Sequence, residues 1–348
     1  MTAHEDIDPS RRRFLGTATG TIAAASLGLL GCGAARASAP PSSQLPGAST
    51  ISFGPIEQIK AGVLDIGYAE AGPANGPVVI LLHGWPYDIH SYVDVVPRLV
   101  AAGYRTIVPY LRGFGSTRFL SSDTMRNGQQ SAVAMDAIAM MDALGIQKAV
   151  IAGFDWGART AAVMGGLWPE RCKAIVAVSG YITVNLEANR KPLPPVAEYG
   201  WWYQYYFATE RGRLGYAANR HDFNKLIWKI ASPKWGFDDA TYDRSAASFD
   251  NPDHVAIVIH NYRWRQSLAD GESRYDDLEA KLAQRPVISV PTITIASDFD
   301  GPLADGKWYR DRFSGPYAHR ILPGIGHNVP QEAPEAFARA VIDVDRLG

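Results

Sequence analysis

The chain has 348 residues, of which 47% are hydrophobic, and its formal net charge at pH 7 is −1. This length and composition fit one large α/β domain with an insertion, because a chain of that size can bury a substantial core. A net charge so close to zero argues against nucleic acid or an anionic membrane as the main partner.

The first 37 residues carry the pattern of a bacterial export signal. Residues 10–16 read SRRRFLG, a twin-arginine signature, and a mildly apolar stretch follows over 17–31. Residues 35–37 form an A-x-A cleavage site. We therefore predict a signal peptide over residues 1–37, export of the folded protein, and a periplasmic location. The apolar stretch is short and rich in Ala, Gly and Thr, so we expect no stable membrane span.

A second interpretation of this region is a lipoprotein signal. Residues 29–32, LLGC, resemble a lipobox that would attach lipid to Cys32, although Leu30 fits that pattern poorly. Cleavage after Ala37 would instead leave Cys172 as the last cysteine, so no disulfide is expected. Residues 38–50 are rich in Pro and Ser and are predicted to form a flexible leader.

Beyond residue 50, short apolar runs alternate with helical patterns. We predict strands at 56–61, 63–69, 78–82, 104–110, 147–154, 173–178, 291–296 and 319–322. The run VVILL at 78–82 is apolar throughout, which is typical of a central parallel strand. A closing helix is predicted to begin at Pro334. The alternation indicates an α/β fold with a mostly parallel sheet, built from residues 51–180 and 286–348.

The alternation stops between residues 181 and 285. This stretch is crowded with aromatic side chains, among them Trp201, Trp202, Tyr203, Tyr205, Tyr206, Phe207, Trp228, Trp235, Tyr262 and Trp264. We predict an inserted helical cap over the carboxyl edge of the sheet. Aromatic residues placed there would enclose an apolar, water-poor pocket. A plain stabilising insertion is the alternative.

The motif that decides the chemistry is GFDWG at 153–157. A strand precedes it at 149–152 and a helical pattern follows it from Ala158, as in the nucleophile elbow of the α/β-hydrolase fold. The elbow residue is Asp155 where a serine is common. A carboxylate that attacks an alkyl carbon leaves an ester, which water can cleave, whereas a serine would leave a stable ether. Asp155 therefore predicts displacement at an epoxide or a carbon–halogen bond. Aspartate also caps helices, and the motif alone leaves that role open.

The partners of an elbow nucleophile follow in the order acid, then histidine. Asp298 and Asp300 come after the strand at 291–296, and His327 stands on a glycine-flanked loop near the end. We prefer Asp300 as the acid because it lies farther out on its loop, where it can turn toward His327; Asp298 is the second choice. A histidine in this position suits a general base that activates water.

The sequence also predicts an oxyanion hole. The tetrapeptide HGWP at 83–86 ends the strand that supplies the second donor in this fold. The backbone N–H groups of Trp85 and Trp156 are expected to point at the oxygen of the tetrahedral intermediate. His83 is expected to have a structural hydrogen-bonding role.

On these motifs the chain resembles the epoxide hydrolases of the α/β-hydrolase fold over about residues 50–347. Two further segments strengthen the resemblance: 203–207 (YQYYF) and 261–263 (NYR) are similar to those carrying the family's ring-opening tyrosines. The resemblance implies that Tyr203 and Tyr262 hold and protonate the epoxide oxygen. Phe154 departs from the family, which usually has histidine there, and we expect its side chain to face away from the chemistry.

The resemblance implies a hydrolase that opens a small apolar epoxide to a vicinal diol through an alkyl ester on Asp155. It implies no cofactor, and no metal-ligand spacing is present in the sequence. The related alternative is a haloalkane or haloacid dehalogenase, although that family often has Asn where Trp85 stands. The alternative from another class is an exported binding protein without catalytic activity. The sequence leaves the oligomeric state open.

Overall fold

The computed structural model describes residues 53–347. The predicted export signal, the leader and Cys32 lie outside these residues. Cys172 is the cysteine of the described chain, and its side chain is buried and free. Within residues 53–347, no helix is long and apolar enough to cross a membrane.

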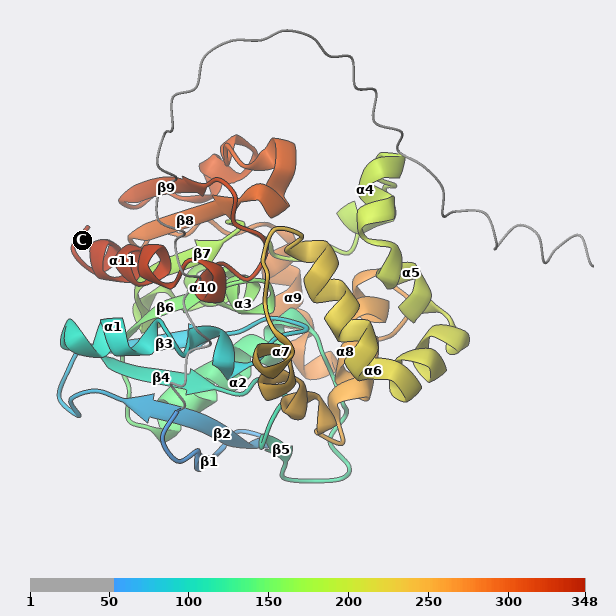
Figure 1. Ribbon diagram of the computed structural model, residues 1–348, viewed down its shortest axis with the longest axis horizontal. Helices are drawn as coiled ribbons and strands as arrows, with labels where there is room; N and C mark the ends of the chain where they lie inside the picture. The colour runs from blue at the N-terminus through green and yellow to red at the C-terminus, as the bar shows by residue number, and fades with distance from the viewer. Residues whose placement is uncertain (1–52, 348) are drawn as a thin grey trace, which may run out of the picture. The chain divides into compact units, whose positions relative to one another are not determined.

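The described residues form a nine-stranded sheet in the order β1-β2-β4-β3-β6-β7-β8-β9, with the short strand β5 paired to β2 (Figure 1). Strands β1 and β2 run antiparallel to their neighbours, and β4 to β9 along this order are parallel. The strands are β1 (Glu57–Ala61), β2 (Leu64–Ala71), β3 (Val78–Leu82), β4 (Arg105–Pro109), β5 (Arg118–Phe119), β6 (Ala149–Gly153), β7 (Cys172–Val178), β8 (Thr292–Ser297) and β9 (Tyr317–Leu322).

The central strands are apolar because both of their faces are covered by helices. All five residues of β6 are buried, as are Val79, Ile80, Leu81 and Leu82 of β3. Figure 1 shows α1 and α11 on one face of the sheet and α2 and α3 on the other. The flanking helices are α1 (Val96–Ala101), α2 (Gln130–Ala143), α3 (Trp156–Leu167), α10 (Val329–Glu332) and α11 (Pro334–Asp345).

A helical insertion separates β7 from β8 and packs as a connected group, in which α5 and α6 both contact α8. Local capping sets two of its helix starts: the Thr209 hydroxyl accepts from the Gly212 N–H, and the Asp238 carboxylate accepts from the Thr241 N–H. The helices are α4 (Pro195–Gly200), α5 (Trp202–Ala208), α6 (Glu210–Ala231), α7 (Asp239–Ala246), α8 (His254–Arg265) and α9 (Asp276–Ala283).

Short 3₁₀ helices fill several of the connections. They are η2 (Ile89–Tyr92), η3 (Pro169–Arg171), η4 (Ala188–Arg190), η5 (Ala247–Asp250), η6 (Ser273–Tyr275), η7 (Asp298–Leu303) and η8 (Lys307–Arg312). Two of them matter for the site. Helix η2 follows the loop after β3, and η7 follows directly on β8, so both stand at the carboxyl ends of parallel strands. Ligands bind at this edge of open α/β sheets.

Candidate active site

Asp155 stands on a strained turn between β6 and α3. Its backbone has φ 51° and ψ −120°, a conformation that is costly for a residue with a Cβ. The flanking glycines make the turn sterically feasible. A Cβ on Gly157 would lie 1.8 Å from the carbonyl oxygen of Leu82, and one on Gly153 would lie 2.5 Å from the carbonyl carbon of Gly157. The Asp155 side chain makes no capping hydrogen bond to α3, so it is available for other chemistry.

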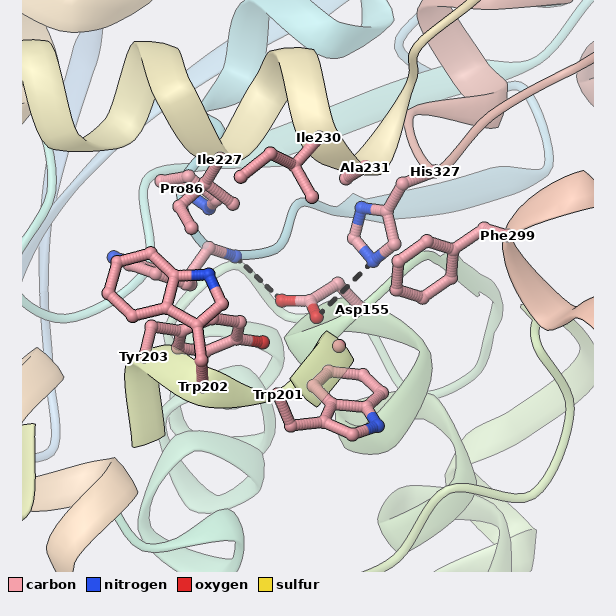
Figure 2. A pocket seen from close by; sticks show the side chains of 12 residues that line it. Pro86, Asp155, Trp201, Trp202, Tyr203, Ile227, Ile230, Ala231, Phe299 and His327 are labelled. Carbon is pink, nitrogen blue, oxygen red and sulfur yellow. Dashed lines mark hydrogen bonds and ion pairs between the residues drawn. The ribbon is translucent and has the colours of Figure 1, made fainter. Parts of the chain in front are cut away.

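The Asp155 carboxylate is held between two neighbours (Figure 2). The backbone N–H of Trp85 donates to Oδ1 at 2.7 Å, and Nε2 of His327 lies 3.6 Å from Oδ2. Gly84 permits this approach, since a Cβ there would lie 2.3 Å from the Cβ of Asp155. Burial alone would raise the pKa of Asp155, but His327, Arg159 and the Trp85 N–H together lower it. Asp155 is therefore an ionised carboxylate with a fixed orientation at neutral pH.

The two predicted oxyanion donors flank this carboxylate differently. Trp85 already donates its backbone N–H to Asp155, and its indole Nε1 donates to the Tyr216 hydroxyl at 2.9 Å. Trp156 is the first residue of α3, where backbone N–H groups have no acceptor within the helix. One N–H group therefore already contacts the Asp155 carboxylate, and the other belongs to the residue that directly follows Asp155.

His327 is fixed by its backbone and by stacked rings. Its N–H donates to the Ser232 hydroxyl at 3.0 Å. The imidazole stacks on Tyr87 with ring centroids 5.4 Å apart, and the ring of Phe299 meets it edge-on at 4.3 Å. Nδ1 lies 3.2 Å from the hydroxyl of Tyr87, which leaves Nε2 directed at Asp155.

The structure does not place Asp300 in hydrogen-bond contact with His327, contrary to the orienting contact we expected. Oδ2 of Asp300 instead accepts from the Ser297 N–H at 2.8 Å, as part of a capping box that opens η7. This capping geometry turns the carboxylate back onto its own turn. Burial raises the pKa of Asp300, and the charge of His327 acts against that shift. Among the described residues, the hydrogen-bond partner of His327 Nδ1 is the Tyr87 hydroxyl.

Asp298, the second choice for the acid, points elsewhere. Its carboxylate forms an ion pair with Lys234 at 2.6 Å and accepts from the Gly324 N–H at 3.0 Å. Both contacts are at the exposed surface. Of the two acids, Asp300 is thus the one whose carboxylate interacts electrostatically with His327.

Tyr203 on α5 and Tyr262 on α8 are brought together near Asp155, whose charge acts on the pKa of both phenols. Their rings meet edge-on with centroids 5.3 Å apart, and both rings contact the indole of Trp85. In Figure 2 the hydroxyl of Tyr203 is directed toward the Asp155 carboxylate. Burial, and then the Asp155 charge, raises the pKa of Tyr203; burial, and then Tyr203, raises that of Tyr262. Both phenols therefore retain their protons and can donate.

A small pocket of about 40 Å³ is lined by Asp155, His327 and Tyr203. In Figure 2 the carboxylate and imidazole lie between two helices of the insertion: α6, which carries Ile227 and Ile230, and α5, which carries Tyr203. The lining is mostly apolar and comprises Trp85, Pro86, Asp155, Gly200, Trp201, Trp202, Tyr203, Ile227, Ile230, Ala231, Phe299 and His327. Within the described residues, no cluster of His, Cys, Asp and Glu side chains is placed to hold a metal ion.

Sequence reasoning missed three aromatic residues around His327. Tyr87 directly follows the HGWP motif, and this position could have indicated that its side chain lies near the site. Phe299 lies between the two candidate acids. Phe154 does not face away as expected: its ring centroid lies 5.9 Å from that of His327 and 5.1 Å from that of Tyr87. The Phe154 ring therefore packs against both the His327 imidazole and the Tyr87 ring that positions it.

Comparisons with known proteins identify the fold and the family. A profile described as the alpha/beta hydrolase fold matches residues 77–213. A crystal structure from Klebsiella pneumoniae subsp. pneumoniae MGH 78578, described provisionally as an epoxide hydrolase, superposes with a TM-score of 0.82. Its sequence is 57% identical, over 84% of this chain and 97% of that one. The chain belongs to the epoxide hydrolases of the α/β-hydrolase fold.

Curated epoxide hydrolases show lower similarity. Epoxide hydrolase A of Mycobacterium tuberculosis is 26% identical over 304 residues, which cover 79% of this chain and 92% of that protein. Epoxide hydrolase B of the same organism is 32% identical over 151 residues, and the chain spans only 42% of its length. The match to epoxide hydrolase A thus covers most of the chain, whereas the match to epoxide hydrolase B has a higher identity over about half as many residues.

Proposed function

We propose that the protein hydrolyses an epoxide to a vicinal diol through an ester on Asp155. The observation that carries this proposal is that one carboxylate, Asp155, lies close to two phenols that can donate protons. Asp155 is ionised and hydrogen-bonded to the Trp85 N–H, and two buried, protonated phenols lie near it: Tyr203, which lines the pocket, and Tyr262, whose ring packs edge-on against that of Tyr203. A carboxylate nucleophile opposite two proton donors suits ring opening, in which carbon is attacked as the oxygen gains a proton.

In the first step, a carboxylate oxygen of Asp155 attacks a ring carbon and the carbon–oxygen bond of the epoxide breaks. Tyr203 and Tyr262 hydrogen-bond the ring oxygen, and one of them transfers a proton as negative charge develops. The product is a hydroxyalkyl ester of Asp155. The predominantly apolar lining excludes water during this step.

In the second step, Nε2 of His327 takes a proton from a water molecule, which attacks the carbonyl carbon of the Asp155 ester. The backbone N–H groups of Trp85 and Trp156 stabilise the oxyanion. Collapse of the tetrahedral intermediate breaks the ester bond, and the departing alkoxide takes the proton of the hydroxyl that water added. The imidazolium proton returns to the tyrosinate, so that the diol leaves and Asp155, His327 and the phenol are restored. We propose Asp300 as an electrostatic support for the imidazolium, since the two charges interact, and Tyr87 as the residue that orients the ring. Residues 181–285 would act as the cap that closes the pocket.

One observation favours a second candidate, haloalkane dehalogenation. The indole Nε1 of Trp156 is buried, and no hydrogen-bond partner for it is found among the described residues. A departing halide needs N–H donors and no proton. Bromide release from a bromoalkane, with no diol formed from an epoxide, would select this candidate.

The test of the proposed function is capture of the ester. In His327→Gln the first step should proceed and the second should stall. Intact-protein mass spectrometry after addition of styrene oxide should then show one substrate mass added, and peptide mapping should place it on Asp155. The double variant Asp155→Asn/His327→Gln is the control and should gain no mass. A wild type that forms diol beside an unmodified His327→Gln would rule out the covalent route.

A further inference from the structure

A second cavity, of about 590 Å³, lies beside the catalytic pocket. It is a groove bordered by residues 188–193, by α5, and by the end of α8. Trp201 lines both spaces, so its side chain stands between the two cavities. The catalytic pocket is small and mostly apolar, and the groove is much larger and has a mixed lining of polar and apolar side chains. A substrate with a long chain attached to its epoxide would not fit in the catalytic pocket alone, and the groove is the neighbouring space that could hold the chain.

The groove carries three cations: Arg190, Lys191 and Arg265. Among the described residues, none of the three has a carboxylate within ion-pair distance. The acid in the lining, Glu198, is engaged by the Leu193 N–H at 2.7 Å and by a tyrosine hydroxyl. Nε of Arg265 is buried without a hydrogen-bond partner in the described chain. The groove lining therefore carries three cations against one carboxylate, and Nε of Arg265 is a guanidinium donor without an acceptor in the described chain.

This charge reaches the reacting groups through Arg265. Its guanidinium carbon lies 5.6 Å from the ring centroid of Tyr262, the second phenol of the site. A second guanidinium, that of Arg159, is buried on α3 and donates to the Ile182 carbonyl at 3.3 Å. Burial, and then the charge of Arg265, lowers the pKa of Arg159 to about 10. Two guanidinium groups that repel one another are stabilised when an anion binds near them.

We propose that this groove binds an anionic group of the substrate, so that the epoxide carries a carboxylate at the far end of an apolar chain. The inference rests on the proposed function and names its substrate class. The epoxide lies at Asp155, the chain passes Trp201, and the carboxylate reaches Arg265, Arg190 and Lys191. Arginine binds carboxylate through parallel N–H donors, which gives this end of the substrate a defined position.

The test compares two substrates of equal chain length that differ at the terminal group, a carboxylate or a neutral hydroxymethyl group: 10,11-epoxyundecanoic acid and 10,11-epoxyundecan-1-ol. The wild type should show kcat/KM for the acid about 10- to 100-fold above that for the alcohol, the value of a charge-assisted contact. Arg265→Gln and the double variant Arg190→Gln/Lys191→Gln should bring this ratio toward one. The preference should also weaken as NaCl is raised, because exposed charges are screened.

The matched control removes two lysines far from the groove. Lys60 and Lys148 are exposed and have no ion pair among the described residues, and Lys60→Gln/Lys148→Gln should keep the wild-type ratio. A ratio near one in the wild type, or an unchanged ratio in the groove variants, would overturn the inference. Groove variants that lose binding to phosphatidylglycerol vesicles while they keep the acid preference would assign the charge to a membrane surface.

A binding measurement separates this inference from the proposed function. Undecanoate binding to Asp155→Asn, followed by tryptophan fluorescence, requires no turnover. It should be tighter than undecan-1-ol binding and should weaken in the groove variants. If undecanoate binds in this way but neither epoxide yields diol, the anion site stands and the proposed reaction fails. Equal binding of the two ligands would refute the anion site whatever the enzyme's activity.

Discussion

At the scale of single residues, His327 is positioned by a hydroxyl where a carboxylate was expected. Nδ1 lies 3.2 Å from the Tyr87 hydroxyl, and Nε2 faces Asp155. To accept a proton from water, neutral His327 must carry its hydrogen on Nδ1, and that N–H then donates to Tyr87. The Tyr87 hydroxyl can accept this hydrogen, so the contact is compatible with the tautomer that base catalysis requires. Asp300 supplies charge at longer range.

The two phenols give the first residue-scale prediction. Removing one hydroxyl, in Tyr203→Phe or Tyr262→Phe, should lower the rate of epoxide opening on the order of 10- to 1000-fold, the value of one transition-state donor. The double variant should be nearly inactive, because the alkoxide would leave without a proton. Initial rates on styrene oxide measure this effect. Bromoalkane turnover is the control, since it needs no phenol proton; full epoxide activity in the double variant would end the assignment.

The pKa shifts of these phenols predict a pH profile. Burial raises the pKa of Tyr203 and of Tyr262 above their usual value, so each phenol stays protonated where a free tyrosine, with a pKa of about 10, begins to ionise. Ester formation in His327→Gln should therefore be constant from about pH 7 to about pH 10. Stopped-flow tryptophan fluorescence follows this step. A rate that declines with a midpoint below that of free tyrosine would contradict donation by buried phenols.

At the scale of elements, the turn between β6 and α3 depends on glycine. A Cβ at position 157 would lie 1.8 Å from the Leu82 carbonyl oxygen, so Gly157→Ala must displace α3 from β3. We expect a loss of about 1–3 kcal/mol in the free energy of unfolding, as for other overpacked sites, and slower ester formation. Chemical denaturation and the His327→Gln background measure the two effects. Gly236→Ala, where a Cβ meets nothing within 4 Å, is the control and should be nearly neutral; equal stability of the two variants would refute the steric argument.

The elements themselves were largely predictable, and their contacts were less so. The predicted strand at 78–82 coincides with β3, and the closing helix begins at Pro334 as predicted. Hydrophobic runs and a proline at the first helical turn are local signals. The direction of the Asp300 carboxylate is decided by its capping box with Ser297, and the stacking of Tyr87 and Phe299 on His327 by tertiary packing. Neither follows from spacing along the chain.

At the scale of the molecule, the site exists only when distant segments meet. Trp85 follows β3, Asp155 follows β6, Tyr203 and Tyr262 come from the insertion, and His327 follows β9. The parallel order of the sheet brings the ends of these strands to one edge. The proposed catalysis therefore requires the complete fold.

We propose that the chain is exported in this folded state by the twin-arginine route. Cys172 is buried and unpaired, so the described fold needs no disulfide and can form under reducing conditions. Arg11→Lys/Arg12→Lys should retain the precursor in the cytoplasm, because the signature at 10–16 requires the arginine pair. Cell fractionation with immunoblotting measures the distribution, and Arg13→Lys, outside that pair, is the control. Export of the double variant at the wild-type level would exclude this route. Incorporation of radiolabelled palmitate that Cys32→Ser abolishes would instead show a lipoprotein signal.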